Sequence, residues 1–343
     1  MKTFEELQAG LGSVLAHNAA GSTVDHALLV LPSYSVGESL LSHYADRIPS
    51  LEHRYLVAVA MLARIPTCRM VFISSADPGR EVVDYYVSLL PRRQRADVRS
   101  RFTQVTVPNA GARSVAEQLL DSPEVVTTVR RLIDGLPVFI EPWNVTDHEV
   151  DAAVTLQAPI NGTPPGLRTL AYKSAGRRLF REAGIPVPYG REDVHSVDEV
   201  VAAAHDILRA RPACTAVVVK HDDSGAGDGN AVLDLRGDIR AAVEGLPAWY
   251  RRDLAAGGVV EERISGAEFS SPSAQVDVLP DGRVVLLATH EQELDGEDGQ
   301  VYVGCRFPAD PAYAAEIGRH AVATGERLAR HGVVGRISVD FAA

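Results

Sequence analysis

Between residues 27 and 140, short apolar runs alternate with segments of helical spacing, and this alternation limits the fold more than any other feature of the sequence. Strand-like runs lie at 27–31, 70–74, 103–107 and 138–140. Helical spacing lies between them, at 51–64, 81–90, 115–120 and 125–133. Strands and helices that alternate in this way build a parallel sheet covered by helices. The pattern predicts the α/β class, with a Rossmann-like sheet.

No dinucleotide-binding fingerprint follows the first predicted strand. Pro32-Ser33-Tyr34-Ser35 stands where a GxGxxG loop would let the backbone approach a pyrophosphate, so NAD is disfavoured. Ser33, Ser35 and Ser75 end or follow strands, at the edge where open α/β sheets bind ligands. These serines are therefore candidates for substrate contacts.

A stretch rich in proline and glycine, residues 157–166, cannot hold regular structure and divides the chain. We expect one domain over residues 1–160 and a second over residues 161–343. In the second, Ser196-Val197-Asp198-Glu199 has the pattern of a capping box, which predicts the start of a helix. Pro280-Asp281-Gly282 separates two strand-like runs and predicts a hairpin.

Lys220 ends the apolar run 216–219 and stands just before a glycine-rich loop, Ser224 to Asn230. Glycines let backbone N–H groups approach phosphate oxygens that a Cβ would hold away. The same residue types also form ordinary solvated turns, but the position after a strand lysine favours a phosphate site. The candidate phosphate-binding residues of the loop are Ser224, Gly225, Gly227 and Gly229.

An extended segment follows, in which the apolar pair Val259-Val260 leads into acidic residues and a bend at Gly266. Backbone N–H and C=O groups of such a segment can meet the edge of adenine, and a later carboxylate can accept from ribose hydroxyls. The alternative is a solvated edge strand with ordinary charges. The candidate nucleoside contacts are Glu261, Glu262, Ile264 and Glu268.

Together these features resemble the ATP-grasp fold. In that family one lysine precedes a helix ending in "aGxPxP", and Lys173 precedes Ala183-Gly184-Ile185-Pro186-Val187-Pro188. A second lysine ends a lid strand before a glycine loop, as Lys220 does, and a Glu-x-x-apolar-x-Gly-x-Glu hinge follows. The resemblance implies a Rossmann-like pre-ATP-grasp domain, then an ATP-grasp α+β domain with a lid at about 187–264. It also implies that Lys173 and Lys220 contact the phosphates of ATP.

Further passages are similar to the pheganomycin-type peptide ligases. They are His53-Arg54-Tyr55-Leu56, 65–75 and Val83-Asp84-Tyr85-Tyr86 in the first domain, and 289–292, 299–308 and 335–341 in the second. The resemblance implies an ATP-dependent carboxylate–amine ligase that forms an amide through an acyl phosphate in peptide natural-product biosynthesis. Its substrates would be a small-molecule or peptide carboxylate and an amine, and no protein nucleophile is required.

The same resemblance assigns roles near the end of the chain. Asp340 is expected to bind Mg²⁺, which prefers hard oxygen ligands, although it could instead cap a loop. Arg306 or Arg336 is expected to neutralise the transferring γ-phosphoryl group, and His290 either lines the substrate site or is a hydrogen-bonded structural residue. The family pattern continues past Asp340 to a Glu-x-Asn segment with further Mg²⁺ ligands. Because the sequence ends at Ala343, we expect a C-terminally truncated form that binds ATP weakly and turns over poorly.

Composition sets further limits. The 34 Lys and Arg against 45 Asp and Glu give a net charge of −11, which opposes binding to nucleic acid. Cys68, Cys214 and Cys305 lack metal or disulfide spacing and indicate a reducing cytoplasm. No apolar run is long enough to cross a bilayer, so we expect a cytoplasmic protein without a membrane partner. The oligomeric state stays open, and a homodimer is compatible with the sequence.

Two other functions fit parts of this pattern. A non-catalytic ATP-binding protein could retain the grasp fold without turnover, and would show no ADP release that depends on an amine. A component of a biotin-dependent carboxylase shares the fold but belongs to larger chains, and would hydrolyse ATP in a bicarbonate-dependent reaction.

Overall fold

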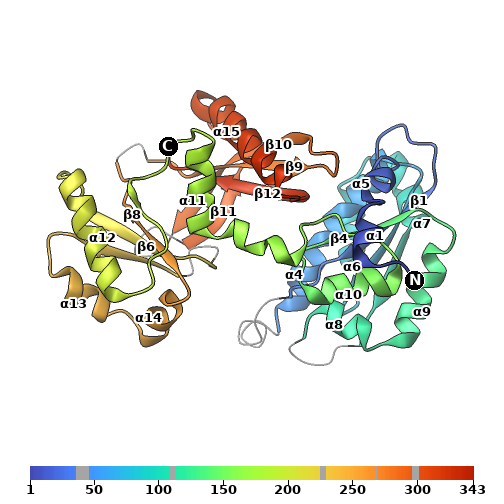
Figure 1. The fold of residues 1–343 in the computed structure, drawn as a ribbon. Coiled ribbons are helices and arrows are strands. Elements are labelled where there is room, and N and C mark those ends of the chain that lie inside the picture. The colour runs from blue at the N-terminus through green and yellow to red at the C-terminus, as the bar shows by residue number, and fades with distance from the viewer. Residues whose placement is uncertain (36–45, 109–112, 225–228, 267–268, 296–300) are drawn as a thin grey trace. The chain divides into compact units, whose positions relative to one another are not determined.

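A computed structural model describes residues 1–35, 46–108, 113–224, 229–266, 269–295 and 301–343 (Figure 1). The chain forms two compact units, Met1–Pro165 and Gly166–Ala343. In the described part of the chain, no helix has both the length and the apolar character needed to cross a membrane.

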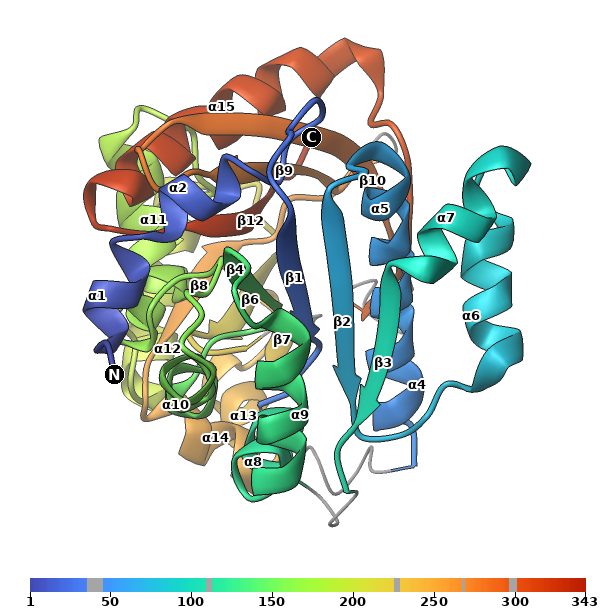
Figure 2. The same ribbon diagram turned by 90° about the vertical axis from the view of Figure 1, so that its right-hand side faces the viewer.

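A four-stranded parallel sheet forms the centre of the first unit (Figure 2). Its strands, in spatial order, are β3 (Phe102–Thr106), β2 (Cys68–Ser74), β1 (His26–Leu31) and β4 (Val138–Pro142). Every residue of β1 is buried, because β1 is paired on both sides and covered on both faces. The predicted α/β class and its four parallel strands are confirmed.

Helices surround this sheet. They are α1 (Phe4–Gln8), α2 (Leu11–Leu15), α4 (Ile48–His53), η1 (Arg54–Ala58), α5 (Val59–Arg64), α6 (Gly79–Ser88), η2 (Arg92–Gln94), α7 (Arg95–Ser100), α8 (Val115–Leu120), α9 (Pro123–Ile133) and α10 (Asp147–Leu156). The predicted helix at 51–64 is divided by the 3₁₀ turn η1. Helix α10 was not predicted, although Thr146 and Glu149 form a complete capping box at its start.

The three serines at the carboxyl edge of this sheet hydrogen-bond within the unit. Ser33 Oγ accepts from Ala116 N at 3.0 Å, and Ser35 Oγ donates to Glu149 at 2.5 Å. Ser75 Oγ lies 2.9 Å from the carboxylate of Glu52. Their suggested contact with a substrate stays a prediction.

The second unit begins with a mixed α/β region built on an antiparallel sheet. Its strands, in spatial order, are β5 (Gly190–Arg191), β8 (Gly258–Glu262), β6 (Ala216–His221) and β7 (Asn230–Asp234). The neighbouring helices are η3 (Pro165–Ala171), α11 (Lys173–Glu182), α12 (Val197–Ala210), α13 (Ile239–Glu244) and α14 (Ala248–Leu254). The alternative of a solvated edge strand at 259–262 is wrong, because β8 pairs with both β6 and β5 and its first four residues are buried.

The predicted capping box at Ser196 is half formed. Ser196 Oγ accepts from the Glu199 N–H at 3.3 Å and caps α12. The Glu199 carboxylate, however, accepts from His195 N at 2.6 Å. A helix starts where the pattern predicts, but the Glu199 carboxylate accepts from the N–H of His195 and not from that of Ser196.

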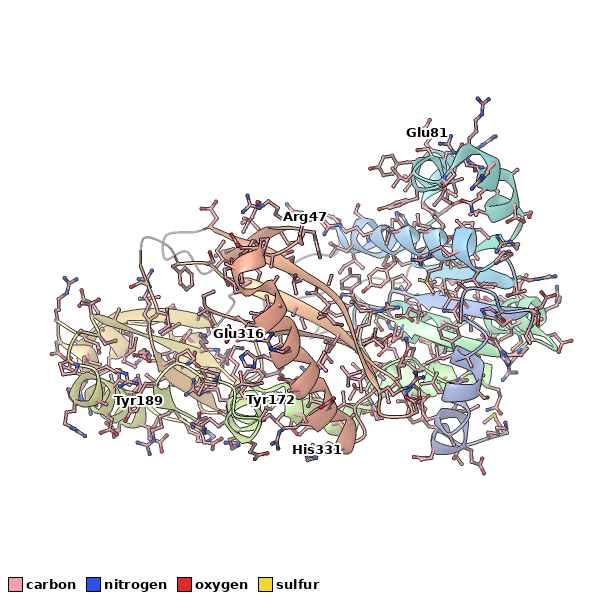
Figure 3. The ribbon with its side chains drawn as sticks, turned by 90° about the horizontal axis from the view of Figure 1, so that it is seen from above. Arg47, Glu81, Tyr172, Tyr189, Glu316 and His331 are labelled. Carbon is pink, nitrogen blue, oxygen red and sulfur yellow. The ribbon has the colours of Figure 1, made fainter. Side chains whose placement is uncertain are left out.

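A second antiparallel sheet completes this unit. Its strands, in spatial order, are β11 (Val301–Arg306), β10 (Val284–Asp295), β9 (Pro272–Val278) and β12 (Gly335–Asp340). Helix α15 (Pro311–Arg330), which carries Glu316 and ends just before His331 in Figure 3, packs on one face through Ile317 and Ala321. The hairpin predicted at 280–282 joins β9 to β10, and Gly282 has the positive φ (83°) that such turns favour.

Candidate functional site

Two of the three lysines in the sequence come together in the second unit. Lys173 is the first residue of α11, and its Nζ donates to Ser224 O at 2.6 Å and to Ser224 Oγ at 2.8 Å. Lys220 lies near the end of β6, and its Nζ forms an ion pair of 2.7 Å with Glu261 Oε2. The structure therefore brings the two predicted lysines, Ser224 and Glu261 into one cluster, which we call the lysine cluster.

Burial of Lys173 disfavours the charged form of its amine. Burial lowers the pKa of its amine to about 8, and the positive charge of Lys220 acts in the same direction. The carboxylates of Asp222, Asp223 and Glu261 offset part of this shift. Two neighbouring ammonium groups, one of them poorly solvated, favour an anionic ligand.

Arg177 is part of the lysine cluster and was not predicted. It is 5% exposed, its Nη1 pairs with Glu261, and its Nε pairs with Glu192 Oε1 at 2.6 Å. Burial would raise the pKa of Glu261, but Lys220 and Arg177 hold it below its usual value. Glu261 thus remains ionised and links Lys220 of β6 to Arg177 of α11. A signal was present in the sequence, since Lys173 and Arg177 are four residues apart and share one helix face.

The glycine-rich loop is described only at its ends. Gly225 and Gly227 lie outside the described residues. Gly229 has φ of 79°, and a Cβ there would lie 2.9 Å from His221 Nδ1 and 3.1 Å from Ser224 Oγ. Only glycine fits this position, both for its backbone conformation and for its space.

The predicted hinge begins in the sheet and then leaves it. Glu262 Oε1 accepts from Tyr189 N at 2.7 Å, and its own N–H donates to Tyr189 O at 2.8 Å. The Arg263 N–H donates to Ala216 O at 3.0 Å, so the backbone donors of both residues are engaged within the sheet. Ile264 follows the sheet and is exposed, whereas Glu268 lies outside the described residues.

The second sheet carries a polar face opposite α15. Asp340 pairs with Ser273, Ser273 with His290, and Arg336 with Asp277, and paired residues share a face. The predicted residues His290, Arg336 and Asp340 therefore point to the same side of the sheet.

Gln275 connects several side chains of this polar face. Its Oε1 lies 3.2 Å from His290 Nδ1, and its Nε2 lies 3.3 Å from both Ser273 Oγ and Ser338 Oγ. Burial raises the pKa of Asp277, and Arg336 opposes that shift. Neither Gln275 nor Asp277 was predicted, because their roles depend on strand register.

Arg306 is separated from the other three predicted residues. It pairs with Glu291, which follows His290 and so points to the opposite face. On that face Glu291 Oε1 accepts from Tyr313 OH at 2.6 Å and from Asp310 N at 2.9 Å.

Asp340 is exposed at the end of β12. Among the residues that the structure describes, no three His, Cys, Asp or Glu side chains are grouped closely enough to hold a metal ion. Mg²⁺ often takes one or two carboxylates and completes its shell with phosphate oxygens and water. Asp340 fits one such ligand.

Comparison with known proteins gives curated relatives and solved structures, but no family model. No protein-family model matches the chain. The chain is 32% identical over 325 residues to L-propargylglycine–L-glutamate ligase from Streptantibioticus cattleyicolor, a match that covers 87% of the chain and 66% of that enzyme.

Solved structures share the fold at low sequence identity. Biotin carboxylase from Campylobacter jejuni, in complex with β-γ-ATP, has a TM-score of 0.60 at 15% identity, covering 92% of this chain and 62% of that one. An ADP complex of N5-carboxyaminoimidazole ribonucleotide synthetase has a TM-score of 0.53 at 13% identity, covering 92% of this chain and 66% of that one. The chain spans no more than about two thirds of any of these three proteins. The family that its motifs resemble is thus confirmed, and the chain belongs to the ATP-grasp carboxylate–amine ligases.

Proposed function

We propose that this protein is an ATP-dependent ligase that joins the carboxylate of one amino acid or peptide to the amine of another. The lysine cluster carries the proposal, because two lysines beside a glycine-rich loop suit the phosphates of ATP. The similarity to a ligase whose name gives two amino acids as its substrates supports this substrate class. The resemblance to pheganomycin-type ligases supports a role in the biosynthesis of peptide natural products.

The lysine cluster would bind the β- and γ-phosphates of ATP. Lys173 now donates to Ser224, and a phosphate oxygen offers it a stronger, charged acceptor. Glu261 keeps Lys220 at a fixed position, with Arg177 supplying a second positive charge to balance the carboxylate. The hinge leaves the sheet after Arg263, and residues 264–266 are the described part that follows.

The reaction we propose has two steps. A carboxylate oxygen of the substrate attacks the γ-phosphorus, a C–O–P linkage forms, and the bond to the β-phosphate oxygen breaks to give ADP, which remains bound. The amine then attacks the acyl carbon, the C–N bond forms, phosphate leaves, and the amine loses a proton. A magnesium ion held by Asp340 would neutralise phosphate charge. The protein itself binds, orients and excludes water, and much of the rate comes from positioning and fixed charge.

The polar face of the second sheet is our candidate for the reacting groups of the substrates. Arg336 could balance the charge of the transferring phosphoryl group, while His290 and its contact Gln275 could bind the substrates. Arg306 projects from the other face, which weighs against an equivalent role for it.

A product screen tests the proposal. The protein is incubated with ATP, Mg²⁺ and pairs of amino acids, and mass spectrometry looks for a product equal to the two substrates minus one water. We expect one ADP for each amide, no product without ATP, and loss of product in Lys220→Ala. If no pair of amino acids or short peptides gives an amide while ATP still binds, the non-catalytic function is favoured. ADP release that depends on bicarbonate would support carboxylase chemistry.

A further inference from the structure

A buried tyrosine outside the lysine cluster connects α14 to the end of the glycine-rich loop. Tyr250 is 3% exposed, and its hydroxyl lies 2.9 Å from Val219 O and 3.1 Å from Gly229 O. Burial raises the pKa of Tyr250, so the hydroxyl keeps its proton and acts as a donor to these carbonyls. One side chain therefore ties Gly229 to the strand that carries Lys220.

His221 links this tyrosine to the other end of the loop. The centroid of its ring lies 4.1 Å from that of Tyr250. The backbone N–H of His221 donates to Gly229 O at 3.1 Å. Its own carbonyl accepts from Ser224 Oγ at 3.0 Å. Ser224 is the residue that binds Lys173 Nζ.

A continuous path of contacts thus runs from Tyr250 to Lys173. It passes through Gly229 and His221 to Ser224, and each step is a hydrogen bond. The space around Gly229 is too small for a Cβ, so a shift of its backbone would be felt at His221 and Ser224. The position of Gly229 therefore affects the position of Ser224 beside Lys173.

We propose that Tyr250 is a positioning residue for nucleotide phosphates: its hydroxyl holds Gly229 against β6 and so keeps Ser224 and Lys173 in place. This inference rests on the proposed function, since it assumes that Lys173 binds phosphate. Tyr250 belongs to none of the motifs that carry the family resemblance. A purely structural role is the alternative, because Tyr250 also belongs to the hydrophobic core around α12.

Tyr250→Phe separates the two roles, because it keeps the ring and its packing on His221 and removes only the hydroxyl. We expect ADP to bind about three- to tenfold more weakly, which corresponds to the loss of one hydrogen bond. Adenosine, which has no phosphate, should bind as it does to the parent protein. The matched control is Tyr34→Phe, which removes a hydroxyl that donates to Leu51 O at 3.3 Å in the first unit. That variant should bind ADP normally.

A second measurement keeps this inference distinct from the proposed function. Lys173 of the ligand-free protein is acylated with a small amine-reactive reagent, and peptide mass spectrometry compares its rate with that of Lys2. Tyr250→Phe should accelerate acylation of Lys173 at least about threefold, because the contact with Ser224 loosens, and should leave Lys2 unchanged. An equal loss of adenosine and ADP binding, or unchanged ADP binding with unchanged Lys173 reactivity, would overturn the inference. If the parent protein binds no nucleotide, the proposed function fails, and the acylation rate alone decides whether Tyr250 positions Lys173.

Discussion

Among the described residues, Lys220 forms an ion pair with Glu261. Its contribution to phosphate binding can be measured by substitution. Lys220→Ala removes a charge-assisted contact with phosphate, worth roughly 1.5 to 3 kcal/mol, so ADP should bind about ten- to a hundredfold more weakly. Calorimetric titration with ADP gives the affinity directly. Lys2→Ala removes an exposed lysine and should change nothing. Normal ADP binding by a folded Lys220→Ala protein would show that Lys220 does not contact phosphate.

Lys173 should be unusually reactive for a lysine. Its pKa of about 8 means that the neutral, nucleophilic amine becomes abundant near pH 8, whereas an ordinary lysine with a pKa of about 10.4 stays protonated. Acylation of Lys173 should therefore increase from pH 7 and level off above pH 9, while that of Lys2 keeps rising. ADP should suppress the reaction, because phosphate favours the charged amine and covers it. A pH profile identical to that of Lys2 would contradict the lowered pKa.

At the scale of the elements, the sequence predicts much of the fold because its signals are local. The runs at 27–31 and 70–74 became β1 and β2, and the proline–glycine turn at 280–282 became a hairpin. Helix α10 was missed although its capping box is visible in the sequence. The helix at 51–64 was predicted without its 3₁₀ break, because apolar spacing does not distinguish one turn geometry from another.

The site could be predicted only in part, because its contacts join distant segments. Arg177 and Glu261 are 84 positions apart, and nothing local to either residue predicts their ion pair. The roles of Gln275 and Asp277 depend on the register of β9 against β10 and β12. Arg306 and Arg336 are alike as sequence candidates, and only the alternation of strand faces separates them. The strand and glycine loop indicated Lys220, and family resemblance added Lys173, which no local pattern pairs with it.

The anchoring of α11 to β8 through Arg177 gives a prediction about stability. Arg177→Met removes one cation from each of two carboxylates, the partly buried Glu192 and the buried Glu261, and each keeps one other cation. The loss of these two charge-assisted hydrogen bonds should lower the free energy of unfolding by about 3 to 5 kcal/mol at pH 7. The neighbouring Arg178 pairs with Asp193 at the surface, so Arg178→Met should cost no more than about 1 kcal/mol. Urea denaturation at equilibrium measures both.

The pH dependence of that cost provides its check. In the parent protein the pKa of both carboxyl groups is held low, so their stabilisation is present above about pH 4.5 and is lost as the pH falls through their folded values. The deficit of Arg177→Met should therefore shrink towards pH 4, as the carboxylates become protonated. A deficit that does not change with pH would mean that lost packing, and not charge, explains it.

At the scale of the whole molecule, all described candidate residues for the nucleotide belong to the second unit. The lysine cluster, Gly229 and the hinge residues up to Ile264 all lie in this unit, whereas the first unit has its own sheet and core. We keep the domain boundary near residue 160 and a lid at about 187–264 as proposals. If these proposals are correct, a bound nucleotide stabilises the second unit and not the first.

Hydrogen exchange of the intact protein tests this division. A ligand at a hundred times its Kd stabilises the state that binds it by about 2.7 kcal/mol, so amides whose exchange requires opening of that state should be protected. ADP with Mg²⁺ should therefore slow exchange in α11, β6 and β8, and the change should extend through the proposed lid. Amides of β1 and β2 should exchange as they do without ligand, because their hydrogen bonds lie within the first unit. Equal protection of β1 and β6 would show that the nucleotide stabilises both units together, and the assignment of the nucleotide to the second unit alone would then be wrong.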